Sequence, residues 1–119
     1  LRPRPGRRVL TLDGYPHQGQ PIMLTEFGGT TYQAHAEEGV KKTWGYTEIK
    51  DAETFARMYE QLLETIIHTA LFSGFCYTQF ADTFQEANGL LHADRTPKIP
   101  LERIRKVTSL SRTYIPGAA

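Results

Sequence analysis

The chain has 119 residues, of which 39% are hydrophobic and 23% are charged, and it carries a net charge of +1. This composition is typical of a single globular domain and excludes a disordered segment. The length excludes a complete (β/α)8 barrel, which needs about 250 residues, and no run of about 20 apolar residues predicts a membrane-spanning helix.

Basic residues are concentrated near the two ends of the chain. Residues 1–20 are rich in Arg, Pro, Gly and Gln, which predicts an arm or loop, and residues 113–119 predict a frayed tail. Aromatic residues do not alternate with the basic ones, as they would on a surface that stacks nucleobases. We therefore expect no nucleic-acid partner and interpret the basic ends as solvated surface.

The first predicted strand is the run PIMLTEF at residues 21–27, which is closed by Gly28 and Gly29. A short, nearly continuous apolar run between Pro and Gly is typical of a strand buried on both faces of a parallel sheet. Residues 28–52 show no hydrophobic period and predict a long loop. Loops of this length are often functional.

Residues 53–71 carry apolar side chains at helical spacing, which predicts an amphipathic helix that ends before Ser73 and Gly74. The run FCYTQF at residues 75–80 predicts a second strand, with a buried thiol at Cys76. A polar loop over residues 83–99 and a helix over residues 101–110 follow. This alternation of strands and helices predicts an α/β fold with a parallel sheet.

Three places in this pattern carry candidate site residues. Glu26 ends an apolar strand, where parallel α/β folds place catalytic groups, although a nearby arginine would equally neutralise it. Gln79 and Asp82 follow the second strand and would suit the hydroxyl groups of a polar ligand, although Asp82 also suits a turn. Trp44, in the sequence WGY, would form either a wall for stacking a sugar or a loop anchor.

Neither a metal nor a cofactor is predicted. The histidines show no metal-ligand spacing to one another or to Cys76. Gly28 and Gly29 lack the surrounding pattern of a phosphate-binding loop.

Taken in order, these segments resemble glycoside hydrolase family 2, which includes β-galactosidases, β-glucuronidases and β-mannosidases. PIMLTEFGG resembles the strand-seven segment of that family, and WGY resembles one of its loop motifs. GFCYTQFAD, then Glu86, NGLL and DRTPK, resembles strand eight and the loop after it. The resemblance covers roughly residues 9–108.

The resemblance implies that residues 21–112 are the C-terminal part of a TIM barrel, with strands seven and eight and their helices. It implies a retaining β-glycosidase whose nucleophile is Glu26, with Trp44, Gln79 and Asp82 as substrate contacts and a β-glycoside as substrate. In that family the acid/base carboxylate follows an asparagine on strand four. No Asn-Glu pair occurs in this chain, so we expect the chain to be a fragment that is inactive alone.

Two alternatives to this interpretation stay open. Other retaining barrels, such as those of cellulases and mannanases, also place a nucleophile after strand seven, although the strand-eight motif argues against them. The chain would otherwise be a free-standing small α/β module that binds a carbohydrate or a protein without catalysis. Since part of a barrel exposes sheet edges and apolar helix faces, we also expect the isolated chain to self-associate.

Overall fold

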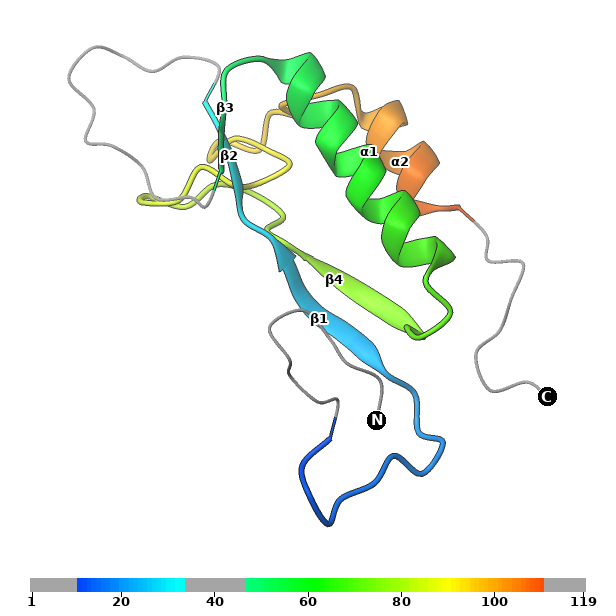
Figure 1. Cartoon of the computed structure of the whole chain (residues 1–119). Coiled ribbons are helices and arrows are strands. Elements are labelled where there is room, and N and C mark those ends of the chain that lie inside the picture. Colours follow the sequence, from blue (N-terminus) through cyan, green and yellow to red (C-terminus); the bar gives the residue numbers. More distant parts are fainter. Residues whose placement is uncertain (1–10, 34–46, 111–119) are drawn as a thin grey trace.

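The computed structural model describes residues 11–33 and 47–110 of the chain (Figure 1). In chain order the elements are β1 (Met23–Gly28), β2 (Thr30–Tyr32), β3 (Thr47–Ile49), α1 (Ala52–His68), β4 (Gly74–Thr78) and α2 (Leu101–Thr108). The fold is a small mixed α/β arrangement with few strands and two helices. Trp44, the first half of the predicted arm and the predicted tail lie outside the described residues.

The strands form two parallel pairs, β1 with β4 and β2 with β3. Both helices lie on one side of the β1–β4 pair, and α1 connects the two pairs along the chain (Figure 1). The predictions of a strand near residue 24, a long helix, a second strand and a final helix are confirmed. The prediction of a single loop over residues 28–52 was wrong, because β2 and β3 lie within it; strands of three residues are too short to show a period.

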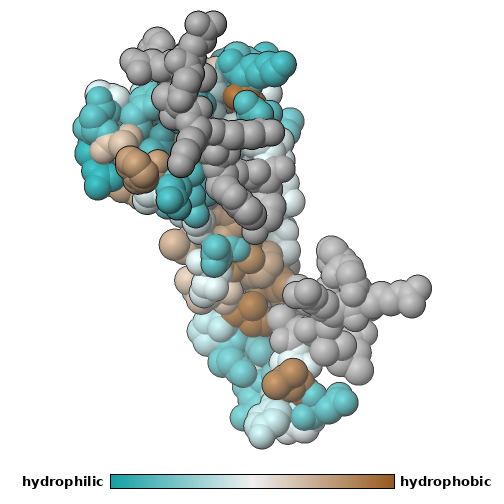
Figure 2. Space-filling model, turned by 90° about the vertical axis from the view of Figure 1, so that its left-hand side faces the viewer, coloured by the Kyte–Doolittle hydropathy of each residue, from teal (hydrophilic) through white to brown (hydrophobic). Residues whose placement is uncertain are grey.

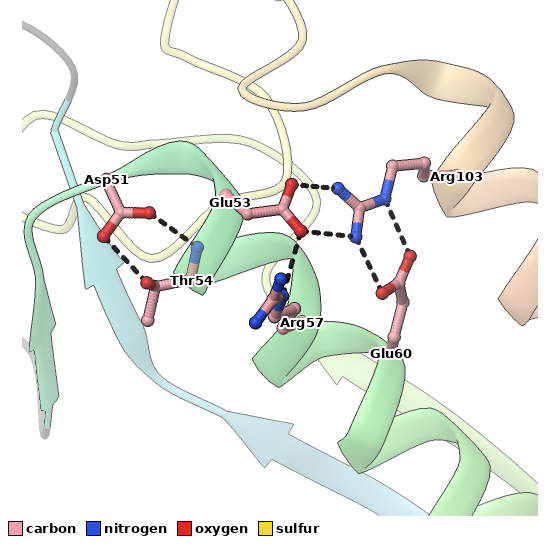
Figure 3. Close-up of polar contacts among 6 residues, drawn as sticks. All are labelled: Asp51, Glu53, Thr54, Arg57, Glu60 and Arg103. Carbon is pink, nitrogen blue, oxygen red and sulfur yellow. Dashed lines mark hydrogen bonds and ion pairs between the residues drawn. The ribbon is translucent and has the colours of Figure 1, made fainter.

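Helix α1 begins where Asp51 caps it. The Asp51 carboxylate accepts hydrogen bonds from the backbone N–H of Thr54 at 2.8 Å and from its hydroxyl at 2.7 Å (Figure 3). These bonds hold the pKa of Asp51 below its usual range. The buried face of the helix then follows the apolar stripe of the sequence, through Phe55, Ala56, Tyr59, Leu63, Ile66 and Ile67.

Aromatic contacts form the core between α1 and the strands. Phe55 stacks on Tyr32 with ring centroids 5.6 Å apart, which joins α1 to β2. Tyr59 meets Tyr77 edge to face at 5.0 Å, and Tyr77 meets Phe27 in the same way at 5.4 Å. Burial raises the pKa of Tyr77 well above its ordinary value. These rings therefore attach both strands of the β1–β4 pair to the helix.

The opposite face of the β1–β4 pair is not covered by the described residues. Phe27 and Phe75 contact each other on the side of α1, whereas Met23 is 52% exposed and Cys76 is exposed. Viewed from that side, apolar surface is visible at the height of the two strands (Figure 2). The predictions that this first strand is buried on both faces and that Cys76 is a buried thiol were wrong. The helices cover only one face of the β1–β4 pair, and Cys76 is exposed.

A guanidinium group connects the two helices. Arg103 of α2 donates two parallel hydrogen bonds to the Glu60 carboxylate, each at 2.8 Å, and one at 2.6 Å to Glu53 (Figure 3). Glu53 also accepts a hydrogen bond from Arg57 at 3.0 Å. Glu53 and Glu60 stand two helical turns apart on α1, so Arg103 fixes the position of α2 along α1. Its bonds lower the pKa of both carboxyl groups.

We expect Arg103→Gln to lower the melting temperature at neutral pH and to lose this effect in acid. The pKa values of Glu53 and Glu60 are lower in the folded chain than the value of about 4.3 in an unfolded one. Their contribution to stability is thus complete above about pH 5, shrinks as the pH falls through the unfolded value, and is lost once the pH falls through the lower folded values. Thermal unfolding followed by circular dichroism over a pH series measures this.

Arg105→Gln is the matched control, because Arg105 pairs with Glu102 within α2 and both side chains are exposed. This variant should change the melting temperature less. A gap between wild type and Arg103→Gln that stays constant into strong acid would contradict the prediction.

Candidate functional site

Glu26 lies in β1, near the carboxyl end of the β1–β4 pair. Strand pairing runs from Leu24 opposite Phe75 to Phe27 opposite Tyr77, so β1 contains one residue more than β4 between these points. Thr25 and Glu26 therefore both stand opposite a single residue, in a β-bulge. Bulges redirect side chains and are common beside active sites.

The Glu26 side chain is exposed. Within residues 11–33 and 47–110, no hydrogen bond or ion pair to its carboxylate is found, and no arginine neutralises it there. The bulge and the absence of such partners leave an oxygen ligand available at the surface. A carboxylate of this kind is able to bind a hydroxyl group or to attack an electrophilic carbon.

Two glycines, Gly28 and Gly29, come one residue after Glu26, beyond Phe27, and hold the ends of the strands together. Gly28 has φ +116° and Gly29 has φ +79°. A Cβ atom on Gly28 would lie 2.5 Å from the backbone oxygen of Thr78, and the N–H of Gly29 donates to the same oxygen at 3.1 Å. Glycine is required here both for the backbone conformation and for the close approach to β4.

Gln79 comes directly after β4, and the structure engages its side chain internally. Its Nε2 donates to Oδ1 of Asn88 at 2.6 Å. Its backbone oxygen accepts from the N–H of Leu90 at 3.1 Å, and the peptide bond from Thr78 to Gln79 is cis. The side chain is partly buried, and its carboxamide secures the loop that returns from β4.

Asp82 forms a buried ion pair with Lys98. Asp82 Oδ1 lies 2.7 Å from Nζ of Lys98; the two side chains are 10% and 0% exposed. The ammonium group also donates to the backbone oxygens of Tyr32 and Ala87, each at 2.8 Å, and lies 5.7 Å from the centre of the Phe55 ring. Burial lowers the pKa of Lys98, and the hydrogen bond to Asp82 acts in the opposite direction.

The Asp82 carboxylate has a second role in the same loop. Its Oδ1 accepts the backbone N–H of Gly89 at 2.8 Å, while Nδ1 of His92 lies 4.0 Å from its Oδ2. Asp82 and Gln79 are thus both held by the loop after β4, whereas Glu26 is exposed on the neighbouring strand. The structure places all three at the carboxyl ends of the paired strands.

Sequence reasoning missed two features of this region. The pairing of Lys98 with Asp82 was not predicted, because the burial of Lys98 depends on contacts with segments far away in the chain. Phe80 and Phe84 were not singled out either, yet they are 70% and 99% exposed. For Phe84 the available signal was its position within the predicted polar loop, whereas Phe80 was assigned to the end of the predicted strand.

The described residues form neither a metal site nor a membrane-spanning helix. Among the described residues, no three His, Cys, Asp or Glu side chains are grouped so that they would hold a metal ion. No helix in that part of the chain is both long and apolar enough to cross a membrane. Compared with known proteins, the chain matches no family model, and no curated protein sequence matches it.

We expect Gly28→Ala to destabilise the chain by about 2 kcal/mol or more, since backbone strain and a steric clash add together. Gly19→Ala is the control, because Gly19 has φ +88° and nothing lies within 4 Å of its added Cβ. The control isolates the cost of the left-handed conformation. Urea unfolding measures both, and equal losses in the two variants would contradict a close approach of Gly28 to β4.

We expect Lys98→Met to destabilise the chain by about 3–5 kcal/mol, because Asp82 is left as an uncompensated buried charge. Adding Asp82→Asn to that variant should recover part of the loss. Lys106→Met, at an exposed position, is the control and should change little. Chemical denaturation of wild type and these three variants tests this. If Lys98→Met is as stable as wild type, the ion pair does not stabilise the chain.

Proposed function

We propose that this chain is the C-terminal part of the catalytic barrel of a retaining β-glycosidase, similar to glycoside hydrolase family 2. In this proposal β1 and β4 are strands seven and eight of the barrel, and α1 and α2 are the helices that follow them. The observation that carries the proposal is the position of Glu26, an exposed carboxylate in a bulge at the carboxyl end of a parallel strand pair. Catalytic groups of such barrels stand at that end of the strands.

The layering of the fold supports the same proposal. One face of the β1–β4 pair packs on α1 through aromatic rings, and Met23 and Cys76 are exposed on the strands. In a closed barrel the strands carry helices on the outside, and their inner face meets side chains of the other strands. The exposed face and the free edges of the pair are where the remaining strands would lie, and in their absence the isolated chain would self-associate.

The chemistry assigned to this chain is nucleophilic. Glu26 would attack the anomeric carbon, and the bond from that carbon to the leaving oxygen would break as an acid donates a proton to that oxygen. Water, deprotonated by the same group, would then attack the glycosyl–Glu26 ester and release the sugar with its configuration retained. Retention requires the two carboxyl groups to stand about 5–5.5 Å apart. The resemblance places the acid/base after an asparagine, and no Asn-Glu pair occurs in this chain, so in this proposal the acid/base would come from protein outside it.

The test is to trap the glycosyl intermediate in the longer protein that contains this chain. A 2-deoxy-2-fluoro β-glycosyl fluoride should label the peptide that carries Glu26, because the 2-fluorine slows breakdown of the glycosyl ester more than its formation. Glu26→Gln removes the nucleophile and should abolish the label. Peptide mapping by mass spectrometry locates the label. Glu48→Gln, at an exposed carboxylate on β3, is the matched control and should still be labelled.

A label on a different carboxylate would overturn the assignment of Glu26. The isolated chain should show no turnover of aryl β-glycosides, because the acid/base is absent. If it turns over these substrates and Glu26→Gln abolishes that activity, the proposal of an incomplete site is wrong.

A non-catalytic carbohydrate-binding module is the second candidate function. The contact between Asp82 and Lys98 favours this alternative, because Asp82 is the first carboxylate after β4 and the fold already engages it. Under this alternative, Glu26 would bind hydroxyl groups only, and no covalent label would form.

A further inference from the structure

The loop after β4 presents an aromatic ring that the fold does not use. Phe84 is 99% exposed at the tip of a turn in which the N–H of Thr83 donates to the oxygen of Glu86 at 3.0 Å. The ring therefore contributes almost nothing to the hydrophobic stabilisation of the fold. Phe80, in the same loop, is 70% exposed.

The base of this loop is held firmly. The N–H of Asp82 donates to the oxygen of Leu91 at 2.9 Å, and the Asp82 carboxylate binds Lys98 and the N–H of Gly89. Ala87 and Leu91 are buried on the returning half of the loop. A ligand that meets Phe84 therefore finds a tip attached to a fixed support, which reduces the ordering cost of binding.

The neighbours of Phe84 indicate what kind of ligand fits. Gln85 and Glu86 are exposed, and within the described residues no hydrogen bond to either side chain is found. An aromatic face beside a free carboxamide and a free carboxylate matches a pyranose ring, which has an apolar C–H face and a rim of hydroxyl groups. A protein partner would favour a larger apolar surface around the ring.

The loop leaves the strand pair at the carboxyl end of β4, the same end near which Glu26 stands on β1. In Figure 1 the loop, coloured yellow-green, extends beyond the carboxyl ends of β1 and β4, on the side away from α1. We propose that Phe84, Gln85 and Glu86 form an outer subsite that holds a pyranose ring of a β-linked oligosaccharide, beyond the sugar bond cleaved at Glu26. This subsite rests on the proposed function for its place in the substrate, but its binding does not require catalysis.

Saturation-transfer difference NMR on the full 119-residue chain tests the subsite, with lactose, cellobiose and β-1,4-mannobiose as probes. At least one of them should receive saturation at the C–H protons of one ring face. Phe84→Ala should reduce the signal several-fold without changing the melting temperature, because the ring is exposed. Tyr15→Ala removes another exposed aromatic ring, which is 73% exposed, and should keep the signal. Sorbitol has the hydroxyl groups but no ring face and should give none.

Three results would overturn this proposal: no signal from any of the three disaccharides, an unchanged signal in Phe84→Ala, or a fall in molecular mass by light scattering in Phe84→Ala. The last result would show that Phe84 contacts a second copy of the chain. Failure of the catalytic proposal gives a different pattern, in which Glu26 takes no covalent label while the Phe84-dependent signal persists.

Discussion

A buried ammonium group determines how the segments of this chain meet. Lys98 binds the carboxylate that follows β4, the backbone oxygen at the end of β2 and the backbone oxygen of Ala87. Its partners stand up to 66 residues away along the chain. An ammonium group without these acceptors would be too costly to bury. Burial of Lys98 therefore requires both the loop after β4 and the end of β2 to be in place. The position of Asp82, and with it the exposed turn that carries Phe84, depends on this one cation.

The layer formed by α1 has a different origin. Its apolar stripe is local, so the hydrophobic pattern alone predicts the helix, and the packing of Tyr59 on Tyr77 follows from that stripe meeting a strand. Arg103 adds a polar constraint, because its two carboxylate partners on α1 fix where α2 lies along the helix. The aromatic contacts supply the burial, and the guanidinium group supplies the alignment.

The sequence predicts those parts of the fold whose cause is local. Helix α1 could be located because apolar residues recur at the helical period, and strands β1 and β4 because each is a short, largely apolar run next to a glycine. The short strands β2 and β3 could not, since three residues show no period. The burial of β1 was overestimated because an apolar run does not reveal whether both faces of the strand are covered. The bulge at Glu26 arises from how β1 pairs with β4, so the sequence of β1 alone does not predict it.

The candidate site shows the same division. Residue type and position at a strand end were enough to select Glu26, Gln79 and Asp82. They were not enough to separate a free side chain from one that the fold itself binds, because that difference depends on Lys98, which binds Asp82, and on Asn88, which binds Gln79, and both come later in the chain. Asp82 is desolvated and paired, whereas Glu26 stands exposed on the next strand.

This asymmetry bears directly on chemistry. Double displacement at an anomeric carbon requires one carboxylate that attacks and another group that transfers protons, and the Asp82 carboxylate is already engaged by Lys98 and by the N–H of Gly89. Within the described residues Glu26 is therefore suited to attack, and Asp82 to maintain the loop beside it. A proton-transferring partner would have to approach across the face of the β1–β4 pair that α1 leaves open, and it is on that face that apolar surface is exposed. Under the proposed function, the exposed face of the β1–β4 pair and the need for a proton-transferring group have one explanation, which is that the same additional barrel strands would supply both.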